Sequence, residues 1–449
     1  MNRFRFAVLV LIIAAAVALC SLAQGQPPKP PPSPLPAANA ATQQAPPTAE
    51  KKITAYTLPP DLYKKAHDRS RIHFQLALIG FFYGLLVLWL ILQSKLAAKY
   101  RDWAERASSR RFVQSMVFSP LLLLTIAVFT LPLDIYGEVI EKRYGISVQG
   151  WASWSWDWIK AELIAIAIGT ILIWLLYTAI RRSPRRAWLY FWLVALPIGV
   201  CLFFLGPWVI DPMFHKFEPL QVKDPALTAR LEQMVQRAGE NIPPDRMYWM
   251  GAGEKTTGLD AYVTGIGASK RMVVFDTTIA KMNNSQIVYV AGHETGHYVL
   301  QHIPKGLAFF AALLLLFFYV VHRLIGWVLG RWGVGWGVRR LDDWASLPVL
   351  FFLLSLLLFV TTPLASAFSR HLEHQADQFG LEVTHGLTPD SAQVAAQAFQ
   401  VLGEVDLADP DPNPVDVFLY YDHPTISDRV RFALTYNPWQ DGGTGEFVK

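Results

Sequence analysis

A His-Glu-x-x-His pattern, formed by His293, Glu294 and His297, is the part of this sequence best suited to do chemistry. It lies in a helix-like run, residues 286–301, that ends just before a long apolar stretch. On a helix the two imidazoles lie one turn apart on one face, so both can bind one metal ion while Glu294 reaches a water molecule on it. The pattern predicts the zinc site of a hydrolase. The simpler alternative is a helix whose two histidines only form hydrogen bonds in a polar patch.

A pair of acidic residues farther along the chain can supply the metal ligand that the His-Glu-x-x-His pattern lacks. Zinc in a catalytic site has three protein ligands and an open position for water, so one ligand must come from elsewhere. Residues 369–377 have the pattern of another helix, on which Glu373 and Asp377 share a face. We predict that Glu373 is the third ligand and that Asp377 accepts the other ring N–H of a ligand histidine. The alternative is a solvated helix face that pairs with Arg370. The competing candidates for the third ligand, which spacing alone does not exclude, are His371 and His374.

These motifs resemble those of the M48 family of membrane zinc metallopeptidases. Within that family, the chain is similar to the Ste24, or type I CAAX prenyl protease, branch rather than to the shorter HtpX branch. The resemblance covers residues 58–432 and is strongest over 259–302 and 369–380. The family's HExxH matches the pattern described above, and its distal ExxxD, after a Ser-Arg pair, matches Glu373 and Asp377. The resemblance implies one Zn²⁺ per chain.

A third match lies in a pair of predicted strands, residues 259–264 and 271–276, joined by a short turn. The family has Asn-Ala-Tyr where this chain has Asp260, Ala261 and Tyr262. In the family this strand is the edge to which an extended peptide adds through backbone hydrogen bonds. Asp260 removes an amide donor and can add a charge, but the backbone of the strand can still bind a peptide. Without the family, the same residues predict an ordinary hairpin.

A fourth match lies near the end of the chain, where His423 and Pro424 precede Arg429, as in the family's HPxxxxR pattern. The resemblance implies that His423 donates a hydrogen bond to the oxyanion that forms when the peptide bond is attacked. Arg429 would then hold a carboxylate or orient the site. Taken alone, a His-Pro pair followed by a basic helix is typical of a capped surface helix.

The predicted chemistry is hydrolysis of an amide by a water molecule that zinc activates. Glu294 would remove a proton from this water and deliver it to the leaving amine. No serine or cysteine nucleophile is needed for this reaction. Cys20 and Cys201 both lie in apolar runs, which argues against a disulfide framework and against thiol catalysis.

The rest of the chain has the composition of a membrane protein, with 53% hydrophobic and 17% charged residues. We therefore expect an α-helical polytopic membrane protein with six internal spans, an N-terminal signal or anchor, and a small zincin-like α/β metalloprotease portion. Each predicted span has about the twenty residues that cross a bilayer core. The spans are residues 74–93, 116–133, 163–180, 187–210, 306–330 and 344–368.

The N-terminus allows two interpretations. Arg3 and Arg5 precede an apolar run, and small residues at 21–23 offer a signal-peptidase site, so residues 1–23 could be a cleaved signal peptide. The resemblance favours a retained membrane anchor instead, because the Ste24 branch has a span at this place. Residues 27–47 are rich in Pro, Ala and Gln and predict an extended, disordered tether.

Basic residues mark three of the loops between the predicted spans. These loops cover residues 95–111, 181–186 and 331–340, and strict alternation of the spans puts all three on one side of the membrane. The positive-inside rule makes this side cytoplasmic, so the zinc site would face the exoplasmic side of a plasma (inner) membrane. The family resemblance favours the opposite, cytosolic side. We follow the charges, because three loops and the N-terminal arginines agree.

The sequence therefore predicts an integral-membrane zinc metalloendopeptidase that acts on peptide or protein substrates and lies in the lipid bilayer. The net charge of +5 comes largely from the basic loops, and no basic face with interleaved aromatic residues predicts binding to nucleic acid. The alternative is a membrane binding or chaperone-like protein with a structural or inactive zinc site, against which Glu294 argues. The expected domains are 1–23 (signal or anchor), 24–57 (Pro-rich tether), 58–210 (membrane helices), 211–304 (peptidase domain), 305–368 (membrane helix pair) and 369–449 (third ligand and C-terminal part of the catalytic domain).

Overall fold

The computed structural model describes residues 52–265 and 267–448. The predicted signal or anchor, and the tether up to residue 51, lie outside this range. Residues 53–57 lie within the predicted tether but pack against the C-terminal half of the chain. The Tyr56 hydroxyl donates to the carbonyl of Ala408 (2.8 Å), and the Ile53 N–H donates to the side chain of Gln393 (2.9 Å). The predicted tether extends to residue 57, but residues 53–57 are held in place by these contacts. The prediction of disorder is therefore wrong for residues 53–57.

Within the described residues, six helices are long and apolar enough to cross a membrane, which confirms the predicted six spans. Most of them extend beyond the apolar runs, because polar residues at their ends continue the backbone hydrogen bonding past the apolar layer. These helices are α2 (Pro60–Gln93), α4 (Arg111–Arg143), α5 (Trp151–Arg182), α6 (Ala187–Val209), α11 (His302–Val328) and α12 (Leu347–Thr384).

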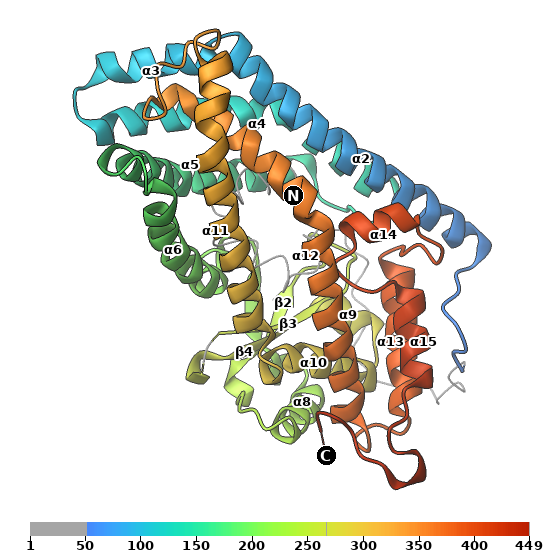
Figure 1. Ribbon diagram of the computed structural model, residues 1–449. Helices are drawn as coiled ribbons and strands as arrows, with labels where there is room; N and C mark the ends of the chain where they lie inside the picture. Colours follow the sequence, from blue (N-terminus) through green and yellow to red (C-terminus); the bar gives the residue numbers. More distant parts are fainter. Residues whose placement is uncertain (1–51, 266, 449) are drawn as a thin grey trace.

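The three basic loops meet at one end of the helix bundle. Arg101, in the short helix α3 (Leu96–Ala107), donates to the Asp343 carboxylate after α11 at 2.7 Å, and both side chains are buried. Arg181 at the end of α5 donates to the carbonyl of Asp342 at 3.0 Å. Arg339 pairs with Glu105 of α3 at 2.9 Å. Figure 1 shows this end far from the strands, which lie at the other end of α11 and α12.

A small mixed sheet lies at the end of the helix bundle opposite the basic loops. Its strand order is β1-β2-β4-β3. Its strands are β1 (Lys216–Pro219), β2 (Met247–Gly251), β3 (Ala261–Thr264) and β4 (Arg271–Phe275). Strand β4 is buried throughout and runs parallel to β2, while β3 pairs antiparallel with β4 and forms an edge of the sheet. The predicted hairpin is present, but its second strand ends at Phe275. Asp276 instead begins α9 (Asp276–Lys281), where its carboxylate accepts the N–H groups of Ala252 and Gly253.

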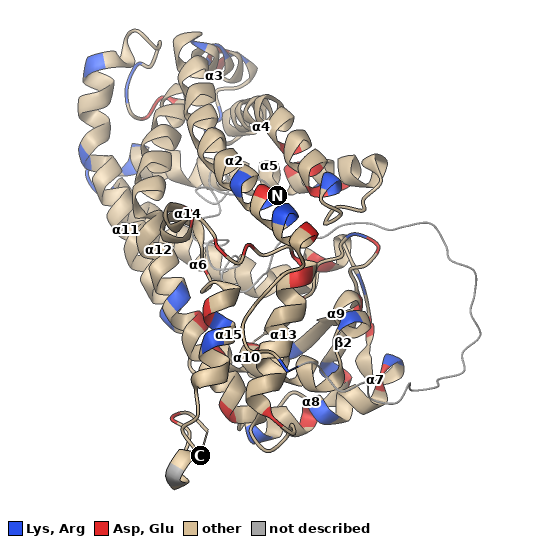
Figure 2. Ribbon diagram, turned by 90° about the vertical axis from the view of Figure 1, so that its right-hand side faces the viewer, with Lys and Arg blue, Asp and Glu red and all other residues tan. Residues whose placement is uncertain are grey.

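Helices from both halves of the chain cover this sheet and share one apolar core. Buried residues of β3, of α10 (Asn284–Val299) and of the C-terminal end of α12 belong to the same cluster. The other helices around it are α7 (Leu220–Lys223), α8 (Pro225–Arg237), α13 (Ser391–Val405) and α15 (Ile426–Thr435). The short helix α14 (Pro414–Tyr420) lies outside this core and packs against α12. Figure 2 shows charged residues gathered around α7, α8 and α15, with few along the middle of α11 and α12.

The helix that carries the HExxH pattern has defined ends. Asn283 caps α10 and forms a reciprocal pair of hydrogen bonds with Gln286, which fixes the first turn. The helix ends at Val299, and Gln301 adopts a left-handed conformation with φ of 57°. This residue redirects the chain, so that α11 begins at His302 and runs into the bundle.

Candidate metal centre

Two glycines let α10 and α12 approach closely enough to bring the site together. A Cβ atom on Gly296 of α10 would lie 3.0 Å from the Phe379 ring of α12. A Cβ atom on Gly380 of α12 would lie 3.1 Å from the Tyr289 ring and 3.2 Å from the backbone nitrogen of His293. Any larger side chain at either position would push the helices apart. The close packing holds the two acidic residues of α12 against the histidines of α10.

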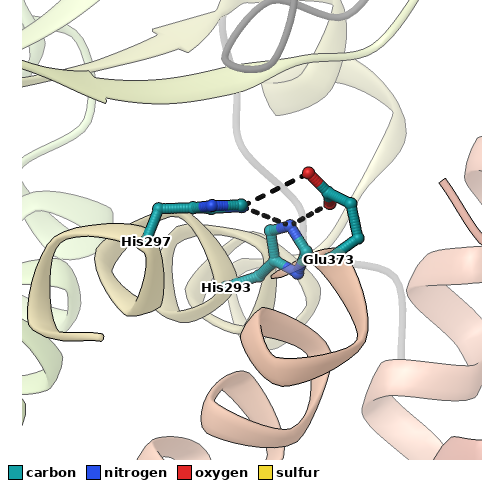
Figure 3. A group of neighbouring side chains, drawn as sticks. All are labelled: His293, His297 and Glu373. Carbon is teal, nitrogen blue, oxygen red and sulfur yellow. Dashed lines mark hydrogen bonds and ion pairs between the residues drawn. The ribbon is translucent and has the colours of Figure 1, made fainter. Parts of the chain in front are cut away.

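Three side chains from these helices converge on one point, as Figure 3 shows. The Nε2 atoms of His293 and His297 lie 3.3 Å apart. The Glu373 carboxylate places Oε2 at 3.1 Å from Nε2 of His293 and Oε1 at 3.6 Å from Nε2 of His297. His293 and Glu373 are buried, and the His297 side chain is 16% exposed. These residues are the one cluster of three His, Cys, Asp or Glu side chains in the described chain whose ligand atoms all lie within 4.8 Å.

The distances between these atoms fit a zinc ion. Zinc binds imidazole nitrogen and carboxylate oxygen at about 2.0–2.2 Å, so neighbouring ligand atoms of a tetrahedral site lie about 3.3 Å apart. The three observed separations, 3.1, 3.3 and 3.6 Å, bracket that value. Two nitrogens and one carboxylate are also the protein ligands of several catalytic zinc sites, and they leave one position open. The residues present therefore suit this metal.

A carboxylate from α12 and an arginine from α15 hold the first histidine. The Nδ1 atom of His293 lies 2.8 Å from Oδ1 of Asp377, which is almost fully buried. Arg429 donates its Nε–H to Oδ2 of the same carboxylate at 2.9 Å and stacks over the Phe399 ring at 4.3 Å. Asp377 thus faces a ring nitrogen on one side and a permanent cation on the other.

The charges around the two histidines differ strongly. Burial lowers the pKa of His293, but its contacts with Asp377 and Glu373 outweigh that effect and raise the pKa to about 9. Burial lowers the pKa of His297 to about 3, so this imidazole is neutral and has a lone pair to offer. The two carboxylates thus require a positive charge at His293, which either a proton or a metal ion can provide.

Glu294 lies beside the cluster without belonging to it. Its Oε1 atom is 3.9 Å from Nε2 of His293, and its side chain is 21% exposed. Burial raises the pKa of Glu294 to about 7, and the nearby Glu373 carboxylate adds to this effect. A carboxylate with a pKa near neutrality can both accept and release a proton at physiological pH.

His423 reaches the cluster from the loop before α15. Its Nε2 atom lies 3.2 Å from Oε2 of Glu373, and its Nδ1 lies 2.9 Å from Oδ1 of Asp422. Burial lowers the pKa of His423, but Glu373 and Asp422 raise it well above its ordinary value. The His423 side chain is 39% exposed, so a protonated imidazole can face a molecule that enters the site.

The residues of the Asp-Ala-Tyr match lie at the start of the edge strand β3. The backbone N–H of Asp260 donates to the Thr278 hydroxyl at 2.8 Å. Burial raises the pKa of Asp260 well above its ordinary value, and the neighbouring Glu294 carboxylate raises it further. Ala261 and Tyr262 are buried, and the Tyr262 hydroxyl donates to Asp211 at 3.3 Å. The Tyr262 side chain thus packs inside the fold and is not free to contact a substrate, whereas Asp260 lies near the cluster.

The other candidate ligands lie outside the cluster. His371 and His374 are on α12, but both are exposed. Arg370 donates to the carbonyl of Val417 at 3.0 Å, so it pairs with neither Glu373 nor Asp377. His302 and Gln375 were not among the predicted site residues, although His302 lies 3.1 Å from His297. The only signal was a third histidine five residues after His297, and that spacing has no fixed meaning across a helix break.

Known proteins with similar sequences and folds include membrane proteases. Two family models match the chain: the CAAX prenyl protease N-terminal model, with five membrane helices, over residues 38–216, and peptidase family M48 over residues 221–437. The chain is 37% identical over 358 residues to the uncharacterized metalloprotease YhfN of Bacillus subtilis, which covers 79% of this chain and 82% of that protein.

One further relative is called a CAAX prenyl protease, and a solved structure with a similar fold is called Ste24p. The chain is 25% identical over 416 residues to CAAX prenyl protease 1 of Saccharomyces cerevisiae, covering 87% of this chain and 88% of that protein. The crystal structure of S. mikatae Ste24p superposes with a TM-score of 0.73 at 22% identity, covering 97% of this chain and 98% of that chain. The last comparison shows a shared fold over almost the whole length.

Proposed function

This chain belongs to peptidase family M48, in its Ste24 or CAAX prenyl protease-like branch, and we propose that it is a zinc-dependent endopeptidase. That it is a multi-pass membrane metalloprotease follows from the family. The observation that carries the finer proposal is the convergence of His293, His297 and Glu373 at separations that suit zinc.

We assign the metal ligands to these three side chains and the proton transfers to Glu294. A zinc ion held there would lower the pKa of a water molecule towards about 7 and polarise the peptide carbonyl. Glu294 takes a proton from the attacking water and passes it to the leaving amine. The pKa of Glu294, raised to about 7 by burial, supports both transfers. An intact general base beside the ligands argues against a purely structural site.

We assign the stabilisation of the oxyanion to His423. Its Nε2–H, 3.2 Å from Glu373, can turn to a carbonyl oxygen that gains negative charge next to the metal ligands. A protonated His423 is the stronger donor, and its raised pKa favours that form. Arg429 supports the site indirectly, because it holds Asp377 against the ring of His293.

We infer that the substrate is a peptide segment that adds to the edge strand β3. The N–H of Phe275 donates to the carbonyl of Asp260, so by the alternation of an antiparallel pair the backbone groups of Tyr262 point to β4. The backbone of Ala261 and Val263 faces the free edge and would supply the hydrogen bonds, although we expected Tyr262 to take part. The Asp260 side chain would face the peptide bond near Glu294. The relatives called CAAX prenyl protease 1 suggest cleavage near a protein C-terminus. A relative that is 37% identical comes from a bacterium, where prenylated substrates are unexpected, so we favour a broader range of membrane-associated peptides.

We infer that the catalytic portion faces the exoplasmic side. The three basic loops meet at the end of the bundle opposite the sheet, and positively charged loops stay cytoplasmic. The test is labelling of a single introduced cysteine at exposed Asp245 in intact cells by a membrane-impermeant thiol reagent. Labelling without lysis supports this orientation, and labelling only after lysis reverses it.

The experiment that tests the function combines a metal analysis with a cleavage assay. Detergent-purified protein is analysed for zinc and incubated with a quenched-fluorescence peptide library, beside the Glu294→Gln variant. We expect about one zinc ion per chain in both proteins and a loss of turnover of about 10²–10⁴-fold in the variant, because glutamine keeps the shape but cannot accept a proton. Cleavage that persists without zinc or without Glu294 would refute the proposal.

A further inference from the structure

His302 and Gln375 form a hydrogen-bonded chain behind the second histidine of the cluster. His302 is the first residue of α11 and is 3% exposed. Its Nδ1 atom lies 3.1 Å from Nδ1 of His297, and its Nε2 atom lies 3.2 Å from Oε1 of Gln375 on α12. The rings of His297 and His302 meet edge to face, with their planes at 78°. Three side chains from three helices are thus linked in a line that ends at the cluster.

The directions of these hydrogen bonds follow from the atoms that must remain free. The Nε2 atom of His297 faces His293 and Glu373, so it must keep its lone pair to bind a metal. The single proton of this neutral ring is then on Nδ1, and the Nδ1 atom of His302 has to accept it. The proton of His302 is therefore on Nε2, from which it is donated to the Gln375 carbonyl oxygen. Each ring N–H of His297 and His302 thus has an acceptor.

We propose that His302 is a positioning residue, which accepts the Nδ1–H of His297 and thereby fixes the ring orientation and tautomer of that ligand. This inference rests on the proposed zinc site. It assigns the two histidine ligands different supports. Asp377 holds His293 with a charged carboxylate, whereas a neutral imidazole holds His297. A neutral acceptor orients the ring without adding a third negative charge to a centre that already contains Glu373 and Asp377.

The position of His302 also links the cluster to the membrane helices. The left-handed Gln301 separates α10 from α11, so the first residue of the membrane helix turns back onto the preceding HExxH helix. Gln375 lies between Glu373 and Asp377 in the sequence of α12. A displacement of α11 relative to α12 would therefore change the contact between His302 and Gln375, and with it the hydrogen bond that orients His297.

The test measures zinc affinity in four full-length variants, by titrating apo-protein in detergent against a competing chelator. In His302→Asn, the side-chain oxygen can take the place of Nδ1 and accept from His297. In His302→Gln, the amide reaches the Nε2 position near Gln375 instead, and His302→Phe removes both contacts but keeps a ring. The matched control is His322→Phe, the same substitution on the same helix far from the cluster.

We expect the zinc dissociation constant to rise about 10–100-fold in His302→Phe and in His302→Gln, and to stay near the wild-type value in His302→Asn and in the control. The Co²⁺ spectrum should shift in the first two variants only, because the geometry of the ligand ring changes. The melting temperature of the apo-protein separates this effect from misfolding. If His302→Phe does not fold, the comparison of Gln with Asn decides.

Equal zinc affinity in His302→Gln and wild type would overturn the positioning role, and so would equal losses in the Asn and Gln variants. Neither outcome affects the proposed function, which depends on zinc and Glu294 in the wild-type protein. If the wild-type protein binds no zinc, the proposed function itself fails. The two proposals therefore fail by different results.

Discussion

Arg429 and Asp377, 52 residues apart in the chain, meet in a two-point ion pair with Nε 2.9 Å from Oδ2. The Asp377 carboxylate also faces the ring nitrogen of His293 that points away from Glu373. The arginine keeps this buried carboxylate charged, and the carboxylate keeps the histidine ring in place. Removing either group would leave the other buried without its partner.

Replacing Asp377 by asparagine should weaken zinc binding. The amide oxygen can still accept from His293, but the charge that balances Arg429 is lost and the amide can turn. We expect the zinc dissociation constant to rise about 10–100-fold in Asp377→Asn. Chelator competition measures the effect, and the exposed Asp245→Asn serves as control. Unchanged affinity in Asp377→Asn would show that the ion pair does not support the ligand.

Replacing Glu373 by alanine should release the metal, because only two imidazoles remain. We expect zinc content to fall from about one ion per chain to a small fraction after dialysis. Alanine at His371 or at His374 should leave zinc content unchanged, since both side chains are exposed and outside the cluster. Full zinc occupancy in Glu373→Ala would mean that another group is the third ligand.

Replacing Gly380 by valine should separate α12 from α10. A Cβ atom there would already lie 3.1–3.2 Å from Tyr289 and His293, and valine adds two methyl groups. We expect a loss of about 1–3 kcal/mol in unfolding free energy together with weaker zinc binding. The control is Gly137→Val in helix α4, where a Cβ atom meets nothing within 4 Å. Equal effects of the two substitutions in thermal unfolding would contradict the close-packing argument.

Asp406 should make the stability depend on pH. Burial raises the pKa of this carboxyl to about 7, although Arg69 and the backbone of Leu259 oppose the shift. The folded protein therefore holds this proton more tightly than the unfolded chain does. The stabilisation is complete below the ordinary pKa of about 4 and is lost as the pH rises to about 7.

The Asp406→Asn variant tests this dependence, because its side chain stays neutral at every pH. Between pH 5 and pH 8 the melting temperature of the wild-type protein should fall relative to that of the variant, measured in the same detergent. Parallel curves over this range would show that Asp406 does not bind a proton on folding.

The membrane part of the fold was largely predictable, because the physics of a bilayer acts on each span separately. A run of about twenty apolar residues has to be a helix there, and all six runs are. Hydropathy does not show where a helix ends in polar surroundings, so α2 begins at Pro60 although its apolar run starts at residue 74. Nor does it show how helices pack, which here depends on contacts such as Arg101 with Asp343.

The part of the candidate site that could be predicted is the part whose residues lie close together in the sequence. The separation of His293 and His297 by one helical turn follows from the sequence. The helix pattern of residues 369–377 predicted Glu373, with His371 and His374 as competing candidates, and the resemblance supplied His423. The contact of His302 with His297 depends on how sharply the chain turns at Gln301, and no periodicity encodes that angle. The contact of Gln375 with His302 depends on the packing of α12 against α11.

The length of α12 limits how close the metal cluster can lie to the membrane that this helix crosses. The helix has 38 residues, about 57 Å, and Glu373 lies about 39 Å from its first residue, Leu347. With a hydrocarbon core of about 30 Å that begins at Leu347, the cluster lies about 9 Å outside the core. An extended chain covers this distance in about three residues. Under the proposed peptidase activity, a substrate anchored in the bilayer would then be cut within a few residues of its membrane anchor.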